Sequence, residues 1–375
     1  MSVVKFSEVA HRANTKEDRF NTDKIYYVGG EHIEPGELFV HDKGFIKGST
    51  IGPMFYCGFK SGQILFVTRN PHLRKCSVAE FDGICSEKTF VIETIDERIL
   101  LQKYLASVML SDDFWNYCEE NKSGGVNYFL NWSTLADYEF ELPSVEEQKA
   151  ISDKLWAAYR LKESYKKLLA ATEEMVKSRF IEMTGDPRTN PKGWPVKTLS
   201  ELATYSIGLT YKPENISEEG TIVLRSGNIQ NSKIDLADVV RVNCPIKESI
   251  YVQKNDILMC SRNGSAALVG KVAQIKDISE PMTYGAFMTV IRSEYSDFLY
   301  LYFQSNDFRE QVSTGKSSTM NQITQNMLDK ISLPLPDDET RNKLSIILHQ
   351  ADKSGFELRK SIDAIDAVIK SLINS

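Results

Sequence analysis

The sequence predicts a tandem of two mixed α/β (α+β) domains, separated by two long antiparallel coiled-coil helices and related by a pseudo-two-fold axis. Three observations support this fold class. The 375 residues suit two domains of about 150 residues plus connecting structure, the second half repeats the first, and a heptad-spaced apolar stripe follows each half. We expect a first domain over residues 1–143, a long helix over 144–183, a second domain over 184–336 and a second long helix over 337–375.

An internal repeat runs through the chain at an offset of 193 residues, which relates Phe6 to Leu199 in the matching motifs Phe-Ser-Glu-Val-Ala and Leu-Ser-Glu-Leu-Ala. The same offset relates three further pairs of segments: Ile64-Leu65 with Ile257-Leu258, Thr68-Arg69-Asn70 with Ser261-Arg262-Asn263, and Leu142-Pro143 with Leu335-Pro336. Between these segments the two halves diverge. The pattern is typical of one fold that presents two different surfaces.

Each half combines short strands with helices. Four apolar runs have the length and the β-forming residues of strands, at residues 63–68, 89–92, 257–260 and 287–291. Residues 97–119 and 296–312 instead carry apolar side chains at helical spacing. Each half is therefore predicted to be an α/β domain.

A long helix is expected to begin after each domain. Ser144 and Glu147 form a capping-box pattern at the first start, and Asp337 is the corresponding cap at the second. The predicted packing residues follow a four-and-three spacing: Ile151, Leu155, Tyr165, Leu169 and Val176 on the first helix, and Leu344, Leu348, Leu358, Ile362, Ile365 and Ile369 on the second. At about 1.5 Å per residue each helix spans on the order of 50 Å, longer than one domain needs. Packing of the helices on each other is favoured over packing of each helix on its own domain.

No motif of an enzyme is found in the sequence. It lacks Asn/Asp-Pro-Pro-Tyr/Phe for amino-methylation, Gly-x-x-x-x-Gly-Lys-Ser/Thr for nucleotide phosphates and Gly-x-Gly-x-x-Gly after a strand. The six cysteines are scattered and indicate reduced structural thiols, with no metal site. No apolar stretch approaches the roughly 20 residues of a membrane helix, and Met1 to Lys5 lack a signal-peptide core. We expect a cytoplasmic protein without catalytic residues or a membrane partner.

Candidate nucleic-acid contacts lie in loops that recur in both halves. Arginine and asparagine can make bidentate contacts to guanine and adenine, and lysine among small polar residues suits phosphate contact. The candidates are Arg69, Asn70, His72, Arg74, Lys75 and Lys122 in the first half, and Arg262, Asn263, Ser265, Lys316, Ser317 and Thr319 in the second. Ordinary solvated loops are the alternative. A net charge of −6 argues against nucleic acid, but binding depends on local patches, and the repetition favours a contact role.

The order domain, long helix, domain, long helix resembles the specificity subunit of type I restriction-modification systems. Leu-Pro precedes each helix, and Glu146-Glu147-Gln148-Lys149-Ala150-Ile151 opens the first. The resemblance covers essentially the whole chain. The second helix departs from the pattern, because residues 338–342 stand where the first has its Glu-Gln pair.

The resemblance implies a division of labour. In that family each target recognition domain reads one half of a split double-stranded DNA target. The helices act as a spacer and as the docking site for two methyltransferase subunits, which bind S-adenosylmethionine and modify adenine. A restriction subunit, a nuclease-translocase, can join to cut unmodified DNA. The chain itself would then bind no cofactor and lend specificity to its partners.

Other functions remain open on the residues alone. A specificity subunit of a two-subunit, type IIB-like enzyme that cuts on both sides of its site has the same organisation. A coiled-coil scaffold would make no DNA contact, and a fused enzyme would turn over substrate by itself.

Overall fold

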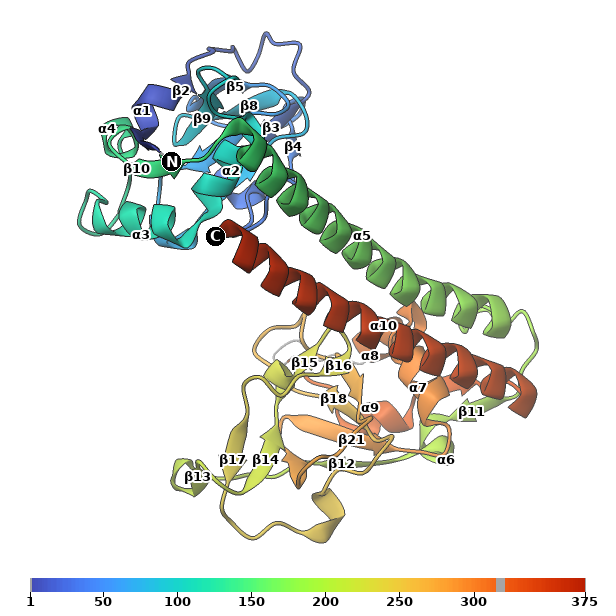
Figure 1. The fold of residues 1–375 in the computed structure, drawn as a ribbon. Helices are drawn as coiled ribbons and strands as arrows, with labels where there is room; N and C mark the ends of the chain where they lie inside the picture. The colour runs from blue at the N-terminus through green and yellow to red at the C-terminus, as the bar shows by residue number, and fades with distance from the viewer. Residues whose placement is uncertain (1, 315–320, 375) are drawn as a thin grey trace. The chain divides into compact units, whose positions relative to one another are not determined.

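The computed structural model describes residues 2–314 and 321–374. The chain divides into two compact units, residues 1–168 with 358–375, and residues 169–357 (Figure 1). Each unit therefore contains one α/β domain and a part of both long helices, α5 (Val145–Thr184) and α10 (Asp338–Ile373). The predicted tandem of two mixed domains with two long helices is confirmed.

The first domain contains two four-stranded sheets. Its elements are β1 (Ser2–Lys5), α1 (Phe6–Val9), β2 (Ala10–Ala13), β3 (Tyr26–Val28), η1 (Gly30–His32), β4 (Gly44–Phe45), β5 (Phe55–Phe59), β6 (Ile64–Val67), η2 (Pro71–Leu73), β7 (Cys76–Val78), β8 (Gly83–Ser86), β9 (Thr89–Thr94), α2 (Gln102–Leu110), α3 (Asp112–Glu120), α4 (Trp132–Ala136) and β10 (Glu139–Leu142). One sheet has the order β2-β9-β6-β7, and the other has the order β4-β3-β8-β5 with β3 and β8 parallel. β1 pairs with β10, so the domain begins and ends on neighbouring strands.

Burial explains why β6 reads as an uninterrupted apolar run. All four of its residues are buried, because β6 lies between β9 and β7 and contributes side chains to two apolar clusters. Trp115 of α3 stacks on Phe66 of β6 with ring centroids 5.5 Å apart. The side chains of α2 and α3 thus cover one face of this sheet and fix the end of β6, where the candidate loop begins.

The second domain repeats this plan. Its elements are β11 (Val196–Thr198), α6 (Leu199–Leu202), β12 (Thr204–Ile207), η3 (Pro213–Asn215), β13 (Ile216–Ser217), β14 (Thr221–Leu224), η4 (Ser226–Asn228), β15 (Ile229–Gln230), β16 (Lys233–Ile234), β17 (Val240–Val242), η5 (Glu248–Ile250), β18 (Ile257–Cys260), β19 (Val272–Gln274), β20 (Met282–Tyr284), β21 (Met288–Arg292), α7 (Ser296–Tyr302), α8 (Asn306–Thr314), α9 (Gln325–Asp329) and β22 (Ser332–Pro334). The sheet β12-β21-β18-β19 has the strand order of its counterpart, and β14 and β20 are parallel like β3 and β8. β15 and β16 form an additional hairpin.

The two long helices contribute side chains to the core of each unit. In the first unit, Leu155 and Tyr159 of α5 share a cluster with Ile369 of α10 and with the domain itself. In the second unit, Val176 of α5 shares a cluster with Leu344 of α10. Within each unit the helices therefore pack on the domain as well as on each other.

The structure places the predicted packing residues at two levels of burial. Leu155, Val176, Leu344, Leu348 and Ile369 are buried, whereas Ile151, Tyr165, Leu169, Leu358, Ile362 and Ile365 are half-buried. Among the described residues, no helix is long and apolar enough to cross a membrane.

Gln148 fixes the start of α5 on the first domain. Its side chain is fully buried and makes three hydrogen bonds to the backbone. Oε1 accepts from Leu101 N at 2.9 Å, and Nε2 donates to Ile99 O at 2.9 Å and to Pro143 O at 3.0 Å. The predicted capping box lies beside it, with Glu147 N donating to Ser144 Oγ at 3.3 Å.

Arg341 makes the corresponding contact at the start of α10. It lies 193 residues after Gln148, and its guanidinium donates to Pro336 O, the counterpart of Pro143 O. The same guanidinium lies over the ring of Tyr295, 4.8 Å from the centroid. The second helix departs from the first in sequence but keeps a side-chain donor for the carbonyl that precedes the helix.

A group of charged residues joins both long helices to the first domain. Glu37 Oε1 accepts from Lys162 Nζ at 3.0 Å and from Lys166 Nζ at 2.8 Å, and Lys162 also pairs with Asp366 of α10 at 2.8 Å. Burial raises the pKa of Glu37, but the hydrogen bonds from Lys166 and Lys162 outweigh burial, so the pKa lies below its ordinary value.

Replacing Gln148 with leucine should destabilise the protein by about 2–4 kcal/mol, because the backbone N–H of Leu101 and two backbone carbonyls lose their hydrogen-bond partner. The measurement is the free energy of unfolding in urea. Lys149→Leu introduces the same side chain at the next, exposed position and should change little. Equal stabilities of the two variants would show that the three hydrogen bonds contribute nothing.

Replacing Glu37 with glutamine should cost about 3 kcal/mol at pH 7, because two lysines lose their carboxylate. A lowered pKa in the folded state means that this stabilisation is present above the unfolded pKa and is lost as pH falls through the folded pKa. The stability gap between wild type and Glu37→Gln should therefore narrow below about pH 4.5. Glu34→Gln, at an exposed neighbour, is the control. A difference in stability between wild type and Glu37→Gln that stays constant with pH would contradict stabilisation by an ionised Glu37.

Candidate nucleic-acid interface

Two loops meet at the end of β6 in the first domain. Thr68 O accepts from Leu130 N at 3.0 Å, and Asn70 N donates to Tyr128 O at 3.0 Å. Arg69 forms an isolated β-bridge with Phe129. We call residues 68–75 and 121–130 the paired loops of the first domain. These are two of the segments in which the sequence placed candidate contacts, and the backbone hydrogen bonds bring them together.

The second domain repeats these contacts at the same offset. Ser261 O accepts from Ile323 N at 2.7 Å, and Asn263 N donates to Asn321 O at 3.3 Å. Arg262 forms an isolated β-bridge with Gln322. The paired loops of the second domain, described here at residues 261–265 and 321–323, are therefore held by the same framework as those of the first.

The turn between β8 and β9 in the first domain, and the turn between β20 and β21 in the second, also bind the paired loops. In the first domain, Lys88 O accepts from Thr68 N at 2.9 Å and from Thr68 Oγ1 at 2.8 Å. In the second, Phe287 O accepts from Ser261 N and from Ser261 Oγ, each at 3.0 Å. Lys88 and Phe287 thus occupy equivalent positions, although their numbers do not follow the offset of the repeat.

The two equivalent arginines lie over aromatic rings. The guanidinium carbon of Arg69 is 5.1 Å from the ring centroid of Phe129, and that of Arg262 is 5.4 Å from the ring centroid of Phe287. Stacking orders a guanidinium without occupying its in-plane N–H groups. An arginine held in this way can present those donors to a planar acceptor pair such as a guanine edge.

Other predicted residues of the first domain are held by intramolecular contacts. Lys75 Nζ donates to Gly30 O at 2.6 Å, and Lys122 Nζ pairs with Glu119 at 2.7 Å while lying 4.5 Å from the ring centroid of Tyr128. His72 is exposed in η2, and Asn70, which precedes η2, has a left-handed backbone with φ 52°. These contacts order the loops around Arg69.

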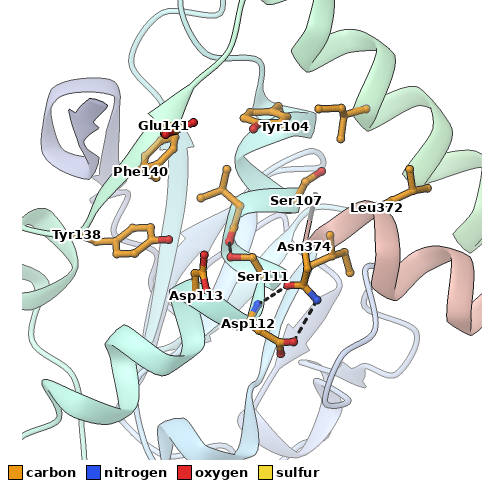
Figure 2. A pocket seen from close by; sticks show the side chains of 13 residues that line it. Tyr104, Ser107, Ser111, Asp112, Asp113, Tyr138, Phe140, Glu141, Leu372 and Asn374 are labelled. Carbon is orange, nitrogen blue, oxygen red and sulfur yellow. Dashed lines mark hydrogen bonds between the residues drawn. The ribbon is translucent and has the colours of Figure 1, made fainter. Parts of the chain in front are cut away.

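Arg74 pairs with Asp112 of α3 at 2.6 Å. Asp112 also binds the side chain of Asn374 at the end of α10, through its N at 2.9 Å and its Oδ2 at 3.1 Å. Figure 2 shows Asp112 and Asn374 together in a pocket of about 410 Å³ lined by α2, α3, β10, α5 and α10. The ion pair gives Arg74 a structural contact to α3.

In the second domain, Asn263 Nδ2 donates to Ser226 Oγ at 3.1 Å, and Asn263 Oδ1 accepts from Ser265 N at 2.9 Å. η4, which contains Ser226, therefore approaches the loop after β18, as Gly30 of η1 approaches Lys75. The predicted contacts Lys316, Ser317 and Thr319 lie outside the described residues.

Sequence reasoning missed Lys88, Phe129, Phe287 and Gln322 as parts of the site. Phe129 and Gln322 follow the offset of 193 and could have been found by extending the repeat. Lys88 and Phe287 could not, because the chain between β18 and β21 is longer than the chain between β6 and β9, which changes the offset. Within residues 2–314 and 321–374, no group of three or more His, Cys, Asp or Glu side chains could hold a metal ion.

The comparisons with known proteins concern the second domain by sequence and nearly the whole chain by fold. Residues 191–365 match the model of the type I restriction modification DNA specificity domain. Two solved chains match nearly the whole fold. One is the specificity subunit of a type I system from M. genitalium, with a TM-score of 0.63, 14% identity and coverage of 99% of this chain and 94% of that chain. The other, from a study of type I complex assembly, has a TM-score of 0.55, 18% identity and coverage of 99% and 96%.

Curated relatives support the same family. The EcoKI specificity subunit of Escherichia coli is 31% identical over 182 residues, which cover 44% of this chain and 39% of the relative. The StySPI subunit of Salmonella potsdam is 28% identical over 183 residues, with coverage of 45% and 39%. Each match thus spans about two fifths of the relative. Together the comparisons confirm the resemblance: residues 191–365 match the type I DNA specificity domain, and the chain is similar in sequence to type I restriction enzyme specificity subunits. They do not support the two-subunit enzyme or the scaffold.

Arg69→Ala and Arg262→Ala should each weaken binding to specific duplex DNA by about 1–3 kcal/mol if the arginines contact bases. Each change should affect one half of the target, because each arginine belongs to one domain. The measurement is binding to duplexes altered in one half at a time, with Arg98→Ala, an exposed arginine paired with Asp96, as the control. Equal losses on specific and random DNA would assign the arginines to phosphates.

Proposed function

We propose that this chain is the DNA-binding specificity subunit of a type I restriction-modification complex and that each domain reads one half of a bipartite target. The observation that carries the proposal is the repeated site. The same hydrogen bonds hold an arginine at the end of β6 and at the end of β18, while the residues around the two arginines differ. One framework with two sets of surroundings suits the recognition of two different half-sites.

The chemistry of the paired loops supports contact with double-stranded DNA. Arg69 and Arg262 offer bidentate donors for guanine, and Lys75 lies in the same loop as Arg69. Lys88 and Lys122 pair with Glu87 and Glu119 and would exchange these partners for phosphates. The net charge of −6 is a property of the whole chain. A local cluster of cations at the loops is sufficient for phosphate contact.

We assign methyl transfer to partner subunits. Leu161 and Leu168 of α5 lie seven residues apart in the first unit, and they are 45% and 52% exposed. A row of exposed apolar side chains at heptad spacing suits the docking of helices from a methyltransferase subunit. Two such subunits, each holding S-adenosylmethionine, would modify adenine, and a restriction subunit can join them in the cytoplasm. The chain would then act as a non-catalytic subunit.

Methyl transfer to DNA by reconstituted proteins tests the proposal. The chain with its methyltransferase subunits and S-adenosylmethionine should methylate the motif found modified in the host genome. Neither the chain alone nor the methyltransferase alone should do so, because one lacks the active site and the other lacks the specificity. Transfer by the purified chain alone, or sequence-specific transfer without the chain, would overturn the proposal.

A further inference from the structure

Each central arginine has two neighbours that the backbone places beside it. Arg69 forms a β-bridge with Phe129, which lies in the loop of residues 121–130. The carbonyl of the turn residue Lys88 accepts hydrogen bonds from Thr68, the residue before Arg69. Arg262 is bridged to Gln322, and Phe287 occupies the turn position. The two domains therefore hold an arginine between the same two positions.

The aromatic residue changes place between the domains. The ring under Arg69 is on the bridge residue Phe129, and the ring under Arg262 is on the turn residue Phe287. The other position carries a polar side chain in each case, Lys88 at the turn of the first domain and Gln322 at the bridge of the second. Each arginine thus lies over the aromatic ring at one of the two positions, and the other position carries a polar residue.

This exchange has a direct physical consequence for base recognition. A guanidinium that lies over a ring is restrained near the face of that ring, and this restraint limits the directions in which its N–H groups can point. Moving the ring from one neighbouring position to the other therefore changes the directions that are favoured. The polar residue at the remaining position offers a second donor or acceptor near the backbone of the arginine.

We propose that Phe129 and Phe287 are positioning residues for the two arginines, and that Lys88 and Gln322 are additional specificity-determining residues, one for each half-site. Lysine donates to the O6 and N7 acceptors of guanine, whereas the glutamine amide pairs with N6 and N7 of adenine. Lys88 pairs with Glu87 at 2.7 Å in the free protein and exchanges that partner for the base. The proposal rests on the DNA-reading function proposed above.

The first test separates positioning from simple packing. The chain with its methyltransferase subunits selects duplexes from a randomised library, and the wild-type complex must first yield a bipartite motif. Phe129→Leu keeps an apolar side chain but removes the aromatic face. It should reduce the preference for one base of the first half-site about 5-fold or more, and Phe129→Tyr should restore it. The unchanged second half-site reports that the variant is folded.

The matched pair Phe287→Leu and Phe287→Tyr should give the same result in the second half-site alone. Leucine variants that keep every base preference of wild type would overturn the positioning role. A wild-type complex that selects no motif would instead overturn the proposed function.

The second test exchanges the polar neighbours. Gln322→Lys should shift one position of the second half-site from adenine toward guanine, and Lys88→Gln should make the reverse change in the first. Each shift should amount to about 5- to 100-fold in relative binding. Motifs that stay identical to wild type in both variants, while Arg69→Ala and Arg262→Ala still alter their half-sites, would exclude base contact by Lys88 and Gln322.

Discussion

A helix longer than its domain has to be fixed where it leaves that domain, and the rest of this structure depends on that constraint. At the start of α5 the buried amide of Gln148 joins three backbone groups of the first domain. At the start of α10 the guanidinium of Arg341 binds the equivalent carbonyl and lies over Tyr295. Because the first turn sets the rotation of a helix, these contacts decide which residues of the following turns face the core.

At the paired loops the backbone hydrogen bonds are the same in both domains, whereas the side chains around them differ. Backbone hydrogen bonds from Leu130 to Thr68 and from Ile323 to Ser261 do not depend on side-chain identity. They hold Arg69 and Arg262 in equivalent places while the neighbours change from Phe129 and Lys88 to Gln322 and Phe287. A recognition surface of this kind can alter its contacts without losing the fold, since the altered side chains contribute little to the core.

Several charged side chains of the first domain and the long helices form ion pairs with each other. Lys162 joins Glu37 of the first domain to Asp366 of α10, so acidic residues at the helices are used in intramolecular pairs. Arg74, which the sequence assigned to nucleic acid, forms such a pair with Asp112. Lys122 of the paired loops also pairs with an acid, Glu119, whereas Lys75 donates to a backbone carbonyl. The net charge of the whole chain does not by itself decide whether the paired loops bind DNA, because binding depends on local charge.

The sequence by itself determined the repeated α/β fold, the two long helices with their caps, and the positions of Arg69 and Arg262. Each of these follows from local periodicity or from a constant offset, both of which can be read along the chain. Tertiary structure alone decided that Lys88 and Phe287 are equivalent, that Tyr159 and Phe180 are buried, and that Gln148 and Arg341 share a role. The physical reason is that these relations join residues from different elements, where insertions change the register and different side chains can satisfy the same backbone group.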